Sequence, residues 1–265
     1  MKSSNNTEAL IASKAEKKLS FFQIFTQLAN RNQKKLIIFL CLLFSSSAAM
    51  VLGIPIVFKE PIIMCLPENT QCSEEQACFQ DFYIDLENGP SSLTAEFGLV
   101  CEKKPQKTFA ITMSFFGILL GCISTTFAPV NQRKRKTHLS VLGIVMGLTL
   151  WAMRFTETYF LGISIEICIC TFCFMAINTF SYLFIGENFK GELAGFLTIM
   201  YSACWALTGI FYALFAYLIN ADWKIFVMVT GTISIFSAVG LLLSKNDAIY
   251  EEGNEEAEEV NIIFY

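Results

Sequence analysis

The chain has little charge and almost no histidine. Of its 265 residues, 16% are charged and one is histidine, whereas 54% are hydrophobic and 26 are phenylalanine. The mean hydropathy of +0.52 lies well above that of soluble domains. The composition therefore predicts an integral membrane protein. The net charge of −4 gives no reason to expect a nucleic-acid partner.

Residue patterns typical of enzymes are also missing. The sequence has no nucleophile beside a base, no phosphate-binding loop and no cluster of metal ligands, so we expect neither catalysis nor a cofactor. The only histidine, His138, ends a basic segment and is expected to be solvated at the membrane surface. Six cysteines lie in apolar runs, where we expect packing rather than metal binding. They are Cys41, Cys122, Cys168, Cys170, Cys173 and Cys204.

Long apolar runs are what the chain has in abundance. A run of about 20 residues crosses the ~30 Å hydrocarbon core as a helix. Helices are expected because lipid offers no partners to open backbone groups. The runs cover residues 36–58, 108–130, 139–155, 159–185, 193–219 and 223–243. The predicted fold class is all-α, with six transmembrane helices.

The distribution of lysine and arginine predicts the orientation. Thirteen of the 19 lie in the N-terminal segment, the 131–138 loop, the 186–192 loop and the C-terminal tail. These segments share one side when six spans alternate, and that side is the cytoplasm or an organellar matrix. We therefore expect both termini there.

Three regions follow along the chain. Residues 1–35 form an N-terminal segment with an interfacial amphipathic helix, whose apolar face in the sequence LSFFQIFTQL lies against the lipid bilayer. Residues 36–243 form the six-helix bundle, with an outer loop at 59–107 inserted in it. Residues 244–265 form an acidic tail. Both end segments have compositions that are expected to be disordered in isolation.

The outer loop contains four cysteines. Two disulfides on an oxidising side of the membrane would each contribute about 2–4 kcal/mol, and the sequence leaves three pairings open. A zinc site is the alternative, although the spacing is poor for zinc and no histidine lies nearby. The candidates are Cys65, Cys72, Cys78 and Cys101.

Three charged residues lie within or beside the apolar runs, where charge is costly and marks functional candidates. Arg154 and Glu157 are three residues apart, so they can pair on one helix face, snorkel to the interface or contact a substrate or ion. Glu166 has no partner nearby in sequence. It can bind a cation, carry a proton or accept a hydrogen bond from a neighbouring helix or subunit.

Gly117 and Gly121 form a G-x-x-x-G pattern in the second apolar run. This spacing permits close contact between two membrane helices. We expect the contact to lie inside the six-helix bundle rather than with a partner.

Several stretches resemble the organic cation/anion transporters of the major facilitator superfamily. The stretch SSLTAEFGLVCEKK, residues 91–104, is similar to the segment that precedes the second helix in that family, with Glu96, Phe97 and Cys101 at its motif positions. Residues 193–226 look like the fifth helix and the turn that follows, which ends in Asp222 and Trp223. The stretch SYLFIGE places Glu187 at the family's acidic position.

The resemblance implies the N-terminal half of a twelve-helix fold, whose substrate would bind between two halves. Two departures from the family matter. Val130 and Asn131 stand where the family's charged latch has an aspartate and an arginine, and the loop after Glu187 is short. The outer loop also lacks an N-x-[ST] glycosylation site, which favours the mitochondrial inner membrane over the plasma membrane.

Two functions are therefore expected. The preferred one is a non-catalytic accessory subunit of a larger membrane complex, such as a mitochondrial respiratory assembly, with protein subunits as partners. The alternative is a half-size transporter of small organic ions, which works as a dimer or with a second half.

Overall fold

The structure, a computed structural model, describes residues 31–66, 70–79, 81–127, 132–156, 159–189, 191–219 and 222–244. Residues 1–30, which contain the expected amphipathic helix, lie outside these residues. Glu157 and the acidic tail beyond Ser244 also lie outside them. The predictions made for these parts therefore stay predictions.

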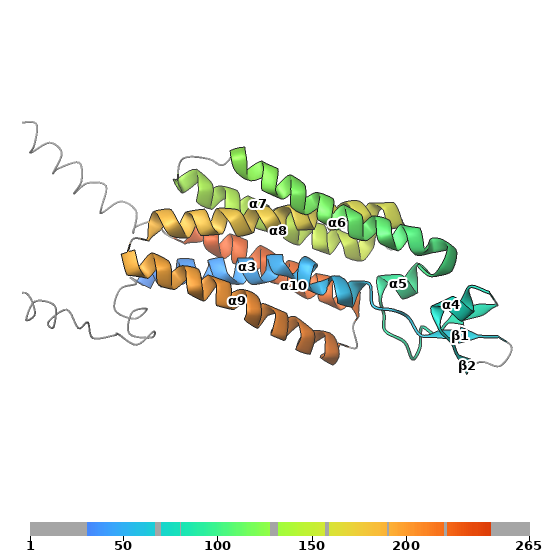
Figure 1. Ribbon diagram of the computed structural model, residues 1–265. Helices are drawn as coiled ribbons and strands as arrows, with labels where there is room; N and C mark the ends of the chain where they lie inside the picture. Colours follow the sequence, from blue (N-terminus) through green and yellow to red (C-terminus); the bar gives the residue numbers. More distant parts are fainter. Residues whose placement is uncertain are drawn as a thin grey trace, which may run out of the picture.

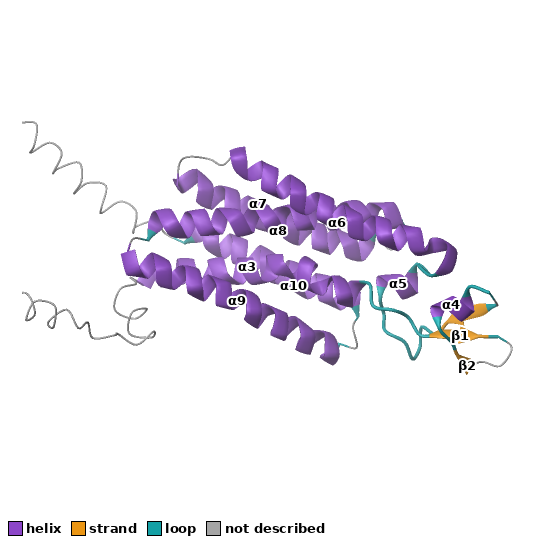
Figure 2. Ribbon diagram, in the orientation of Figure 1, coloured by secondary structure: helices purple, strands orange, loops and turns teal. Residues whose placement is uncertain are grey.

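Six helices of the described residues are long and apolar enough to cross a membrane, as the sequence predicts. Figures 1 and 2 show them as one elongated bundle with a small domain containing strands at one end. The helices are α3 (Arg31–Val57), α6 (Lys104–Ser124), α7 (Gln132–Phe155), α8 (Phe160–Asn188), α9 (Gly191–Leu218) and α10 (Trp223–Leu243).

Three helices begin well before the expected boundaries. Helix α3 begins at Arg31 rather than residue 36. Helix α7 begins at Gln132 rather than residue 139, because the lysines and arginines there are good helix formers and no proline or glycine interrupts them. Most of the expected basic loop is thus the first turns of α7. Helix α6 begins at Lys104, where Pro105 occupies a first-turn position that proline favours. Hydropathy misses all three extensions because they are polar.

The helices form two rows. One row contains α6, α8, α3 and α9, in this order. The other row contains α7 and α10, which contact each other. Helix α7 also contacts α8 of the first row, and α10 contacts α3. Exchanging α3 with α8, α6 with α9 and α7 with α10 maps this set of contacts onto itself, whereas the smaller contact of α8 with α9 has no counterpart of similar size between α3 and α6. The main helix contacts are therefore related by an approximate exchange of the first three helices with the last three.

Glycine brings α6 and α8 together. A Cβ atom at Gly117 would lie 2.2 Å from the backbone oxygen of Cys168, and one at Gly121 would lie 2.7 Å from that of Phe172. The two backbones can approach this closely only because neither glycine has a side chain. The G-x-x-x-G pattern therefore packs within the bundle, as predicted.

The outer domain, residues 59–103, has a three-stranded antiparallel sheet in the order β2-β1-β3. Its buried cluster is small and contains Ile63, Cys65, Ala77 and Val100. The elements are β1 (Ile63–Cys65), β2 (Thr70–Gln71), α4 (Glu74–Ala77), β3 (Phe82–Ile84), α5 (Leu93–Glu96) and the 3₁₀ helix η1 (Cys101–Lys103).

Candidate functional site

Two disulfides close the outer domain. Cys65 pairs with Cys72 across the turn from β1 to β2, and Cys78, just after α4, pairs with Cys101 at the entry to α6. The prediction of two disulfides is confirmed, and the structure selects one of the three pairings. All four thiols are used in these bonds, so they are not available for a zinc ion.

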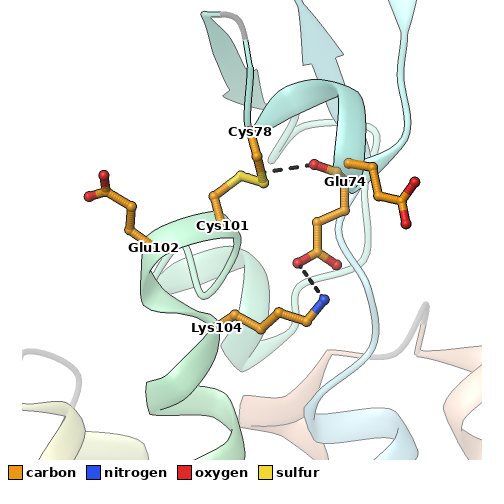
Figure 3. Close-up of a pocket in the computed structure, with 6 residues that line it drawn as sticks. Glu74, Cys78, Cys101, Glu102 and Lys104 are labelled. Carbon is orange, nitrogen blue, oxygen red and sulfur yellow. Dashed lines mark hydrogen bonds and ion pairs between the residues drawn. A yellow bond between two sulfur atoms is a disulfide. The ribbon is translucent and has the colours of Figure 1, made fainter.

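The Cys78–Cys101 bond lies in a shallow pocket of about 380 Å³ on the outer domain. Figure 3 shows the Lys104 ammonium and the Glu74 carboxylate pointing toward each other across this pocket, 3.2 Å apart, whereas Glu102 points away. Cys101 has a φ of 51°, a left-handed conformation that is uncommon without glycine. The disulfide thus closes the outer domain at η1, and the ion pair joins the domain to the first turn of α6.

Glu96 is the centre of a second joint, which we call the outer clamp: Glu96, Trp223 and Lys224. The Trp223 indole Nε1 donates to Glu96 Oε2 at 3.0 Å, and Lys224 Nζ lies 2.8 Å from Glu96 Oε1. Trp223 is fully buried, so its indole N–H needs this acceptor. The clamp connects α5 of the outer domain with the start of α10.

Neighbouring residues fix the two elements of the outer clamp. The Trp223 amide donates to the Ser91 carbonyl at 3.0 Å. The Asp222 carboxylate caps α10 by accepting from the amide of Lys224 at 2.9 Å. Phe97 packs edge-on against Phe160 of α8 with ring centroids 5.5 Å apart. The residues that carry the family resemblance at the outer end therefore act together as a contact between the outer domain and the bundle.

At the opposite end, Glu187 pairs with Arg135, which joins α8 to α7. The Arg135 side chain is buried, with 6% exposed, whereas the Glu187 side chain is 39% exposed. Next to it, Lys136 donates to the backbone carbonyl of Ser244, just after α10. A cation at a helix C-terminus complements the helix dipole. We call this end of the bundle the basic end.

Glu166 of α8 accepts a hydrogen bond from the residue that follows α7: Thr156 donates from Oγ1 to Glu166 Oε1 at 2.9 Å. The other carboxylate oxygen, Oε2, is buried and has no hydrogen-bond partner among the described residues. The cation-binding and proton-carrying roles of Glu166 stay predictions. Arg154 lies in the last turn of α7. The expected Arg154–Glu157 pair falls on a residue outside the described ones.

A cavity of about 350 Å³ is lined by residues of α3, α9 and α10. Two of the membrane cysteines, Cys41 and Cys204, line it together with Ser45 and Thr208. Thr208 Oγ1 donates to Ser45 Oγ at 2.9 Å, and the Tyr212 hydroxyl donates to the Ser45 carbonyl at 3.2 Å. These polar groups satisfy one another between α3 and α9. The described residues contain no group of three or more metal-ligating side chains.

One titratable group outside the membrane has a shifted pKa. The Asn88 side chain donates to Asp85 Oδ2 at 2.9 Å, and the amides of Asn88 and Glu87 donate to Oδ1 at 3.1 Å each. The side-chain amide of Asn88 is the main cause that lowers the pKa of Asp85. The carboxylate closes the turn after β3.

Three residues of these contacts are missed by the sequence reasoning. Lys224 follows the family-like Trp223, and its large separation in sequence from Glu96 hides their pairing. Arg135 stands in a run of basic residues, any of which could face Glu187. Thr156 is an ordinary polar residue at a helix end. A signal existed only for Arg135, because Glu187 and the basic segment are predicted to lie at the same end of the bundle.

Comparison of the sequence with known protein families and with curated proteins finds no relative.

Proposed function

We propose that this chain is a non-catalytic structural subunit of a larger membrane complex, built on one six-helix half of a major facilitator-type transporter. The flanking helices α6 and α9 carry the proposal. Only 22% of the most apolar window of α6 and 17% of that of α9 are buried, against 44–56% for the other four helices. Each is thus attached along one narrow stripe and leaves most of its surface for other contacts.

The exposed sides of these two helices are apolar and aromatic. Neither has a charged side chain between Thr108 and Phe127 or between Leu193 and Leu218. Large exposed residues on α6 include Phe109, Phe115, Phe116, Leu119 and Ile123, and those on α9 include Ile199, Leu207, Ile210, Phe211 and Leu214. Such surfaces suit lipid or other membrane helices.

The charged residues within the membrane part of the bundle lie on other helices than α6 and α9, with Arg154 on α7 and Glu166 on α8. Sites for ions within a membrane rely on charged or polar groups near the midplane. Glu166 of α8 accepts a hydrogen bond from Thr156, just after α7, near the end of the bundle that carries the outer domain. The flanking helices therefore offer protein contact rather than an organic-ion site. The expected location is the mitochondrial inner membrane, on the absence of a glycosylation site from the outer loop.

Native gel electrophoresis of the full chain from its own membrane, followed by mass spectrometry, tests the proposal. We expect the chain to migrate with a complex far larger than its 29.8 kDa. Leu119→Trp on α6 and Ile210→Trp on α9 should reduce this comigration. Val141→Trp, at a similarly exposed position of α7, is the matched control. Migration as a lone monomer would contradict the proposal.

The second candidate is a half-size organic ion transporter that works as a dimer. The approximate correspondence between the main contacts of the first three helices and those of the last three favours this candidate. Inverted three-helix repeats build each half of such transporters. Purified chain in liposomes would then take up an organic cation and crosslink to a second copy through α6 or α9. Uptake of the organic cation by these liposomes, with no other protein present, would contradict the subunit proposal and support the transporter.

A further inference from the structure

A pocket of about 620 Å³ opens between α3 and α10 at the basic end of the bundle. It lies where the apolar part of α3 begins and that of α10 ends. Asn32, Lys35 and Ser244 line its polar part, and Phe39, Phe236 and Val239 line its apolar part. The volume falls within the range of about 300–1,000 Å³ typical of small-molecule sites.

The polar and apolar parts follow the direction of the helices. From Lys35 to Phe39 is about one turn of α3, and from Ser244 back to Phe236 is about two turns of α10, so both helices change from polar to apolar toward the membrane centre. A phospholipid has the same order of groups, with its headgroup at the surface and its chains below. The pocket therefore matches a lipid in direction as well as in chemistry.

Gly240 allows the apolar part to form. A Cβ atom there would lie 2.3 Å from Cε1 of Phe39, so the ring rests directly on the backbone of α10. Phe39 then packs edge-on against Phe236, with ring centroids 6.0 Å apart. The two rings form a firm apolar wall, and the exposed Val239 borders the same pocket.

Positive charge collects at the polar part. The Lys35 side chain is exposed and lines the pocket. Lys136 of α7 is buried and donates to the carbonyl of Ser244, which also lines the pocket. Basic pockets between membrane helices attract acidic lipid headgroups.

We infer that this pocket binds one anionic phospholipid from the adjacent leaflet. Its phosphate pairs with the Lys35 ammonium, and one acyl chain lies along Phe39, Phe236 and Val239. The inference is independent of the proposed function, since either a subunit or a transporter would hold such a lipid.

The full chain is reconstituted in nanodiscs of phosphatidylcholine and phosphatidylglycerol in equal amounts, extracted in mild detergent and weighed by native mass spectrometry. We expect one retained phosphatidylglycerol in preference to phosphatidylcholine. Lys35→Gln should lower this preference roughly five-fold, since one lysine near a lipid surface is worth about 1 kcal/mol. Lys59→Gln, at the other end of α3, is the matched control and should change nothing.

A second variant, Val239→Trp, fills the apolar part of the pocket and should remove the retained lipid of either kind. Equal retention of the two lipids by the natural chain would overturn the inference. So would an unchanged preference in both Lys35→Gln and Val239→Trp. The inference also fails if lipid is retained only after Glu255, Glu256, Glu258 and Glu259 are replaced by glutamine, because the acidic tail rather than a lipid then occupies the pocket.

Discussion

The outer domain and the membrane bundle are held together by different interactions. The outer domain has a small buried cluster and two disulfides, which close chain segments with sequence separations of 7 and 23 residues. The described bundle has free cysteines only, and its helices approach through glycines such as Gly117. One region depends on covalent links, and the other on close backbone packing.

This difference follows from the two solvents. A domain as small as the outer one buries too little apolar surface to be stable alone, so crosslinks replace a large core. Between membrane helices the hydrophobic effect gives no driving force, because lipid is as apolar as leucine, and small residues supply the close packing instead. The outer clamp at Glu96 joins the two regions.

The largest effect is expected from Gly117→Leu. Its side chain would collide with the backbone oxygen of Cys168, which cannot move aside as a flexible side chain would. The loss of bundle stability should be at least about 3 kcal/mol, at the upper end of overpacking effects. The measurement is the thermal unfolding midpoint in detergent micelles. Gly195→Leu on α9, where a Cβ meets nothing within 4 Å, should shift it little. Equal shifts would show that the α6–α8 contact is not tight.

The next effect concerns the outer domain alone. Replacing Cys78 and Cys101 by serine should cost about 3 kcal/mol, because the unfolded segment gains freedom. Replacing Cys65 and Cys72 should cost roughly 1 kcal/mol less, since their loop is shorter. Hydrogen exchange of the β1 and β3 amides reports both losses, while the thermal unfolding of the bundle should stay the same. A larger loss from the shorter loop would refute the ranking.

A smaller effect is expected at the joint between the two regions. Glu96→Ala leaves the buried Trp223 indole N–H without its acceptor and should cost about 1–3 kcal/mol. Glu96→Gln keeps an acceptor and loses the partly exposed ion pair with Lys224, which is worth at most about 1 kcal/mol. The exchange rate of the Trp223 amide is the readout. Glu102→Gln, which lies outside the clamp, should leave that rate unchanged.

Much of the fold is predictable from hydropathy, because each membrane helix must be apolar over most of its length. The participation of Cys65, Cys72, Cys78 and Cys101 in disulfides is also predictable. Their pairing is not, because it depends on how the folded outer domain brings Cys72 next to Cys65 and Cys101 next to Cys78.

The contacts of the candidate site are harder to predict. Glu96 and Glu187 stand out by resemblance to a family, yet their partners Lys224 and Arg135 come from elsewhere in the chain. Polar pairs between helices carry no periodic signal. For the same reason the sequence alone does not identify Thr156 as the hydrogen-bond partner of Glu166.

The smallest effect is a pH dependence within the outer domain. The pKa of Asp85 is lowered below its ordinary 3.8, mainly by the Asn88 side chain. A carboxyl whose folded pKa is depressed stabilises the fold above the unfolded pKa, and this contribution is lost as the pH falls through the folded value. Exchange of the Glu87 and Asn88 amides should therefore rise at a pH below about 3.8. In Asp85→Asn this pH dependence should disappear; its persistence would assign it to another acid.

Photo-crosslinking within the native membrane tests the proposed function most directly. A photoreactive residue replaces Leu119 on α6 or Ile210 on α9, both more than half exposed, and Val141 on α7 serves as the control. The account predicts that the first two positions crosslink to a membrane protein of a different sequence, whereas Val141 crosslinks mainly to lipid. Crosslinks from Leu119 and Ile210 to lipid alone, or to a second copy of this chain, would contradict it.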